Sequence, residues 1–101
     1  MSVIATLTTA GRTAVIAVEG DLDGNSDDDF LRRIEEASTL DLAELVLEMH
    51  TQQLGAGSIR AIVYARQQMA DDVQLIIASP RPGVLEALIA ADLDDSVIIR
   101  H

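Results

Sequence analysis

The residues with the clearest chemical potential stand between an apolar run and the next helical pattern, within the segment Leu45 to Ile62. Gly55, Ala56, Gly57 and Ser58 close a polar loop there and lead into that helix. Small residues at a strand-to-helix junction let a partner or an anion approach the backbone closely, and the first amides of the helix are free to receive it. This segment predicts a working surface made of a loop and a helix start.

Two interpretations compete for Ser58. As the N-cap of the helix, its hydroxyl would accept a hydrogen bond from the backbone amides that follow. As a phosphate acceptor, it would place a charge of about −2 at a helix start. Glu48 and His50 share one face of the preceding strand, so a nucleophile set of Glu48, His50 and Ser58 is a further hypothesis. The sequence favours a helix cap and a solvated loop histidine.

Other patterns of catalysis or ligand binding are missing from the chain. It has no lysine for a phosphate-binding loop and no cysteine for a thiolate metal site. The loop at 20–24 is only superficially similar to a calcium loop, because the later bidentate glutamate is absent. The acids Asp27, Asp28 and Asp29 suit the first turn of a helix with Ser26 as its N-cap. We therefore expect no enzyme, no metal site and no cofactor.

Apolar periodicity predicts the elements that must position these residues. The expected order is strand 3–8, strand 13–18, helix 27–38, strand 45–49, helix 58–69, strand 73–78, a helix opening at Pro82 with an apolar face of Val84, Leu85, Leu88 and Ile89, and strand 96–99. A turn at 10–12 makes the first two strands an antiparallel hairpin. The later alternation of strands and helices predicts parallel pairing through right-handed crossovers. The fold class is therefore α/β, with a single mixed sheet of about five strands.

Composition limits the partners. The chain has 101 residues, which suits a single domain over 1–101, and a formal net charge of −10. This charge would repel a nucleic acid, whereas it would attract a basic protein surface. No apolar run reaches the length of a membrane-spanning helix, and no basic region precedes an apolar segment at the N-terminus. We expect a cytoplasmic protein with no nucleic-acid partner and no membrane insertion. His101 could be the remnant of an expression tag.

At four places the chain resembles a STAS domain, the fold of bacterial anti-sigma factor antagonists, and the resemblance covers nearly the whole chain, from Gly11 to Ile99. The segment 18–23 (VEGDLD), with Ser26 and Phe30, is similar to a G-E-L-D motif with a following polar residue, and 45–49 (LVLEM) is similar to a V-L-D-L strand. The helix with Ile59, Ile62 and Val63 is similar to the helix after a D-S-S-G-L signature. The segment 88–94 (LIAADLD) is similar to L-x-x-x-G-L-D. The resemblance implies a β-β-α-β-α-β-α-β order with helices packed mainly on one face of the sheet.

In that family, the typical member binds the kinase domain of an anti-sigma factor, and phosphorylation of the first serine of D-S-S-G-L ends the binding. When Ile59 is aligned with the signature leucine, this serine position matches Ala56, which cannot accept phosphate. Gly55 then replaces the aspartate, and Ser58 falls on the glycine. The resemblance therefore implies a partner-binding domain without the usual phosphoswitch, in which Ser58 is not phosphorylated.

Three functions stay open at this point. The leading hypothesis is an anti-sigma factor antagonist-like module that binds a regulatory partner, such as an anti-sigma factor kinase, through Asp23, the segment 55–58 and Arg60. The alternative is a structural STAS subunit of a stress-signalling or transport-ATPase assembly, which includes a homo-oligomer. A small enzyme or nucleotide-binding module rests only on the glycine-containing helix start and on Glu48 and His50.

Overall fold

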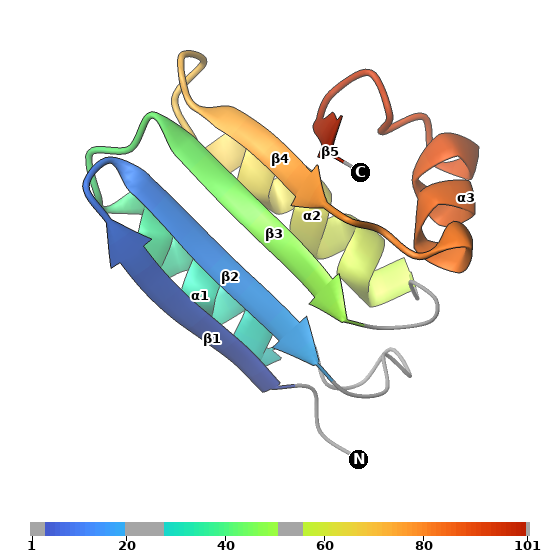
Figure 1. Cartoon of the computed structure of the whole chain (residues 1–101), viewed down its shortest axis with the longest axis horizontal. Coiled ribbons are helices and arrows are strands. Elements are labelled where there is room, and N and C mark those ends of the chain that lie inside the picture. Colours follow the sequence, from blue (N-terminus) through green and yellow to red (C-terminus); the bar gives the residue numbers. More distant parts are fainter. Residues whose placement is uncertain (1–3, 20–27, 51–55, 101) are drawn as a thin grey trace.

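A computed structural model describes residues 4–19, 28–50 and 56–100 of the chain. The strands are β1 (Ile4–Ala10), β2 (Thr13–Glu19), β3 (Glu44–His50), β4 (Gln74–Ala78) and β5 (Ile98–Arg100), and the helices are α1 (Asp28–Ser38), α2 (Ala56–Gln68) and α3 (Pro82–Ala90). The five strands form one sheet in the order β1-β2-β3-β4-β5, in which only the β1–β2 pairing is antiparallel. Figure 1 shows α1 and α2 behind the sheet and α3 at its β5 side. The predicted α/β class, mixed sheet and element order are confirmed.

A tight hairpin sets the register of the first two strands. Ala10 lies opposite Thr13, so Gly11 and Arg12 form the loop between them. Gly11 has a φ of +62°, in the left-handed region that glycine adopts without steric cost. The predicted turn at 10–12 is confirmed, and the pairing then continues without a bulge from Ala10 back to Ile4.

The core lies between the helices and one face of the sheet. Alternate strand residues point to this face, and they are Ala5, Ala14, Ile16, Val18, Leu45, Leu47, Met49, Leu75 and Ile77. Against them pack Phe30, Ile34 and Ala37 of α1, which are fully buried. The i, i+4 and i+7 spacing of these three residues places them on one stripe of the helix. Within the described residues, no helix is long or apolar enough to cross a membrane.

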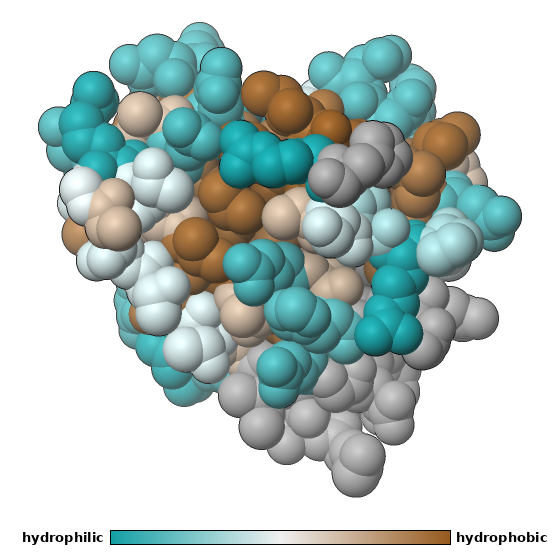
Figure 2. All heavy atoms as spheres, in the orientation of Figure 1, coloured by the Kyte–Doolittle hydropathy of each residue, from teal (hydrophilic) through white to brown (hydrophobic). Residues whose placement is uncertain are grey.

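The opposite face of the sheet carries an apolar row that none of the described helices covers. Val15, Val46, Ile76 and Ile98 stand in register across four neighbouring strands. In Figure 2, apolar side chains gather over the middle of this face between polar ones. Ile76 is nevertheless only 1% exposed. Arg100 and Glu44 form an ion pair (3.6 Å) on this face, and they pair in register with the β4 positions on either side of Ile76.

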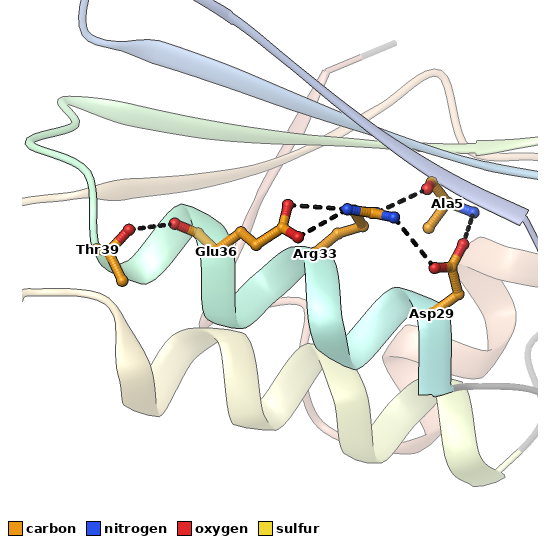
Figure 3. Close-up of polar contacts among 5 residues, drawn as sticks. All are labelled: Ala5, Asp29, Arg33, Glu36 and Thr39. Atoms are coloured by element: carbon orange, nitrogen blue, oxygen red, sulfur yellow. Dashed lines mark hydrogen bonds and ion pairs between the residues drawn. The ribbon is translucent and has the colours of Figure 1, made fainter.

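Helix α1 is attached to the outer strand by two side chains (Figure 3). The Ala5 N–H donates to Asp29 Oδ2 at 2.9 Å, and the Ala5 carbonyl accepts from Arg33 Nε at 3.2 Å. Arg33 also pairs with Asp29 (3.4 Å) and with Glu36 (2.7 Å). Hydrogen bonding to Glu36, together with its charge, raises the pKa of Arg33 above its ordinary value. We refer to Asp29 and Arg33 as the α1 clamp.

Several predicted boundaries shift because backbone amides are used in turns. The Val73 N–H donates to the Ala70 carbonyl and the Ser96 N–H donates to the Leu93 carbonyl, so β4 and β5 begin later than predicted. Ser26 and Asp27, proposed for the start of α1, lie outside the described residues.

The predicted apolar face of α3 is only partly correct. Pro82 opens the helix as expected, and Val84 and Leu88 are fully buried. Leu85 is half-buried, whereas Ile89 is 55% exposed. The helix ends at Ala90, immediately after this residue, and the buried Leu93 in the following turn contributes to the core instead.

Candidate functional site

The carboxyl ends of the parallel strands form one edge of the sheet. There β2 ends at Glu19, β3 at His50 and β4 at Ala78, and each is followed by the connection to a helix. Figure 1 shows the first turns of α2 and α3 near the ends of β3 and β4. In open α/β sheets, ligands and partners bind at this edge because connecting loops and helix N-termini meet there.

The structure places only part of the predicted partner surface. Asp23 and Gly55 lie outside the described residues. Ala56 and Gly57 are the first two described residues of α2, so the backbone of the predicted segment is helical from Ala56 onward. Arg60 follows on the same helix, and its side chain is exposed. The described part of this surface is therefore the first turn of α2.

The predicted N-cap role of Ser58 is wrong. The helix already includes Ala56 and Gly57, so Ser58 lies inside it, and its exposed fraction is 1%. Among the described residues, Ser58 is the single buried polar residue, and it does interact with another group.

The physical reason is helical spacing. Ala61, Ile62, Ala65 and Met69 are also buried, and they follow Ser58 at i+3, i+4, i+7 and i+11. Ser58 therefore belongs to the stripe of α2 that faces the core. A small serine can occupy this stripe where the helix approaches the sheet closely, and the same spacing was already present in the sequence.

Glu48 and His50 do lie together, as predicted from their shared face. Glu48 Oε2 and His50 Nε2 are 3.3 Å apart, and both side chains are substantially exposed. A hydroxyl that could complete a nucleophile set would have to be accessible to a substrate, and Ser58 is buried. Ser58 therefore cannot complete the predicted nucleophile set with this pair.

A shallow cavity of about 390 Å³ adjoins this pair, and sequence reasoning missed half of its polar lining. Ser79 and Arg81 contribute to it from the connection between β4 and α3. Ser79 has a φ of +47°, and its N–H donates to the Arg100 carbonyl. In the sequence, 79–82 indicated only a strand end and a proline-initiated helix. The signal was positional, because the carboxyl end of a third parallel strand must lie at the same edge.

Outside this edge, a group of three carboxylates follows α3. Oxygens of Asp92, Asp94 and Asp95 lie within 4.8 Å of one another, and all three residues are exposed. Exposed acidic groups of this kind are common in proteins without a bound cation, and within the described residues nothing else marks a metal site here.

The carboxyl edge therefore offers exposed charged and hydrogen-bonding groups around a shallow cavity, an arrangement suited to contact with another protein. No curated protein matches the chain. The family comparison, in contrast, matches the STAS domain over residues 5–101, nearly the whole chain. STAS domains are generally non-catalytic interaction modules. The match includes every strand except the first residue of β1, all three helices and the carboxyl edge, and the chain belongs to the STAS domain family.

Proposed function

We propose that this STAS domain binds a regulatory protein, such as an anti-sigma factor kinase, through its carboxyl edge, and that it does so without the serine phosphoswitch of its family. The described part of the proposed surface comprises the first turn of α2 with Arg60, the Glu48–His50 pair and Arg81. Asp23 and Gly55 complete it in the sequence.

The observation that carries this proposal is the placement of hydroxyl groups at the start of α2. Ala56 stands where the family serine is expected and has no hydroxyl. Ser58 is 1% exposed and faces the core, so a kinase cannot reach its oxygen while the domain is folded. A phosphate on Ser58 would place a charge of about −2 at a buried position. The burial of Ser58 therefore argues against control by phosphorylation of this serine.

The charges of the edge suggest what a partner would present. Arg60 and Arg81 are exposed, and no ion pair involves either of them among the described residues. In a chain with a net charge of −10, these arginines form local positive points on an otherwise acidic molecule. Acidic side chains of a partner could pair with them, and bidentate contacts to arginine would give the contact its orientation.

Calorimetry with an anti-sigma factor kinase from the same genome tests the proposal. We expect binding that persists after incubation with ATP, together with no phosphate on residues 55–58 by peptide mass spectrometry. Arg60→Ala should weaken binding by about tenfold. Arg32→Ala is the matched control, because Arg32 is also exposed but lies on α1, and it should leave the affinity unchanged.

A gain-of-function variant sharpens the test. Ala56→Ser restores a hydroxyl at the family position, so the kinase should phosphorylate it and the affinity should then fall. The absence of binding to any such kinase would refute the proposed partner. A phosphate on Ser58 of the folded wild-type protein would refute the loss of the switch.

The uncovered sheet face favours a second candidate, a structural subunit of a larger assembly. In the row of Val15, Val46, Ile76 and Ile98, Ile98 is 44% exposed and Val15 is half-buried, so another subunit could cover these two residues, whereas Val46 and Ile76 are already buried. Native mass spectrometry of pull-downs separates the two candidates. A large complex of fixed composition supports the structural role, whereas a complex with one kinase supports the first proposal.

A further inference from the structure

The backbone groups of β1 alternate between those that bind β2 and those that face outward. Ala10 and Thr13 flank a two-residue hairpin loop, so they form a hydrogen-bonded pair, and every second residue of β1 does the same. The N–H and C=O groups of Ala5, Leu7 and Thr9 therefore point away from β2. The bonds that Ala5 makes to Asp29 and Arg33 agree with this assignment.

Of these three residues, one has hydrogen-bond partners for its outward backbone N–H and C=O groups. The α1 clamp occupies both backbone groups of Ala5 (Figure 3). For Leu7 and Thr9, the described part of the chain supplies no partner on the outward side. Figure 1 shows β1 at the margin of the sheet, with no other strand beyond it. Among residues 4–19, 28–50 and 56–100, nothing pairs with the end of β1 near the hairpin, which is therefore an open strand edge in the described structure.

The residue types of β1 leave this edge ready for pairing. Natural edge strands usually carry a lysine, a proline or a bulge that prevents association with another strand. The strand IATLTTA has none of these, and its threonines and branched aliphatic residues favour extended backbone. In the part of the chain that the structure describes, the α1 clamp protects this edge at Ala5 and no other such feature is present.

Beside β1, two arginines offset two of the three carboxylates that they contact, and this reduced local charge favours a second copy of this acidic chain as the occupant. Arg12 pairs with Asp41 beyond the hairpin, and Arg33 pairs with Asp29 and Glu36 along α1. Copies that each carry a net charge of −10 repel one another, and the repulsion is weakest where arginines neutralise nearby acids.

We propose that two copies associate through antiparallel pairing of their β1 strands about a two-fold axis at Thr8. Leu7 of each copy then lies opposite Thr9 of the other, and each outward N–H donates to a carbonyl across the axis. The open segment is self-complementary, because the same two residues supply every donor and acceptor. The α1 clamp sets this register, since sliding the strands to include Ala5 would break its bonds to α1. The two sheets become one continuous sheet.

Sedimentation equilibrium measures this association. The paired edge is smaller than a standard interface of about 1,600 Å², so we expect a weak dimer with a dissociation constant of about 0.1–1 mM that tightens when salt screens the net charge. Thr9→Pro removes an outward N–H in each copy while leaving the ladder to β2 intact, and it should weaken the dimer by at least about tenfold. Thr9→Val retains the N–H and should leave the dissociation constant unchanged.

Hydrogen exchange supplies a readout that depends on the register. The amides of Leu7 and Thr9 should gain protection as protein concentration rises, whereas those of Thr6 and Thr8 should be protected at every concentration. A protein that stays monomeric at about 1 mM in high salt would overturn the proposal. Dimerisation that survives Thr9→Pro, or concentration-dependent protection confined to another surface, would also overturn it.

A second pair of variants covers the case in which Thr9→Pro does not fold. Thr8→Lys places two like charges opposite each other at the two-fold axis and should weaken the dimer by about fivefold. Thr6→Lys makes the same change on the same exposed face but away from the axis, and the dimer should persist. Equal effects of the two lysines would contradict the register. None of these results depends on the carboxyl-edge partner proposed above.

Discussion

Replacing Ser58 with glutamate tests whether the hydroxyl at the start of α2 is closed to modification. The side chain is 1% exposed and lies on the same stripe as Ala61, Ile62 and Ala65. A carboxylate at this position must lose its water and find space in a packed core. If the position were instead the accessible cap that the sequence suggested, a glutamate there would be tolerated.

The size of the effect follows from three contributions. Desolvation of a carboxylate costs several kcal/mol, and the larger side chain adds roughly 1–3 kcal/mol of overpacking. The helix N-terminus returns at most about 1–2 kcal/mol, because its free amides favour a negative charge. We expect Ser58→Glu to lower the free energy of unfolding by about 3–5 kcal/mol. Small domains have only about 5–15 kcal/mol in total, so this variant should be marginally folded.

Urea denaturation at pH 7, followed by far-ultraviolet circular dichroism, measures this loss as a lower midpoint concentration. The matched control is Arg60→Glu, which introduces the same side chain two residues further along α2 at an exposed position and should change stability by less than about 0.5 kcal/mol. Acid should partly rescue Ser58→Glu. Burial raises the pKa of the new carboxyl, so its destabilisation is greatest at pH 7 and diminishes as the group becomes protonated at low pH.

Equal stability of Ser58→Glu and Arg60→Glu would refute the reasoning. That result would mean that the serine faces water, and the argument against phosphorylation at this turn would fail with it. A large loss for both variants would show that the first turn of α2 does not tolerate negative charge for a reason other than burial.

Three further predictions follow from contacts elsewhere in the fold. The single tyrosine, Tyr64, should titrate in an absorbance experiment above its ordinary pKa, because desolvation and the nearby charge of Glu35 both disfavour the phenolate. Glu35→Gln should lower the midpoint of this titration. The stability that Tyr64 contributes should be lost as the pH rises above 10. Asp29→Ala removes the acceptor of the Ala5 N–H and should cost about 1–2 kcal/mol by thermal denaturation, whereas Asp29→Asn keeps an oxygen there and should cost less. Phe30→Ala deletes the largest fully buried side chain and should cost about 3–5 kcal/mol in a urea titration, and a cost below about 1 kcal/mol would contradict its place in the core.

Local pattern was sufficient to predict the order of elements and the sheet. The hairpin followed from Gly11 between two β-prone runs, and the parallel pairing followed from the alternation of strands with amphipathic helices. Each of these signals lies within a few residues of the feature that it predicts. The same property explains why strand ends were less accurate, since the turns that delay β4 and β5 depend on which carbonyl an amide meets in space.

The candidate site was harder to predict because two rules applied to one residue. Ser58 satisfied the chemistry of an N-cap, but it also stood at helical spacing from Ala61 and Ile62, and burial of the apolar stripe decided its position. Arg81 was overlooked for a different reason. It contributes to the carboxyl edge through the position of β4 in the sheet, and no nearby motif marks it.

Contacts between residues distant in sequence could not be predicted from local pattern. The bond from Ala5 to Asp29 joins residues 24 positions apart, and nothing in the strand sequence indicates that its edge is held by α1. The sequence predicted a strand at 3–8, and the structure shows that Ala5 is bonded to α1 while Leu7 and Thr9 have no outward partner among the described residues.

The two proposed surfaces can act together, because they lie on different sides of the domain. Antiparallel pairing of β1 reverses the strand direction between the copies, so their carboxyl edges face opposite ends of the joined sheet. A two-fold axis perpendicular to the sheet also keeps both uncovered faces on the same side. Such a dimer would present two copies of the Arg60 surface pointing apart, and each could hold a separate partner. Avidity for a dimeric or clustered partner would then depend on Thr9, which is remote from the contact itself. Thr9→Pro should therefore lower apparent affinity for an immobilised partner at high density while leaving affinity for a monomeric partner in solution unchanged.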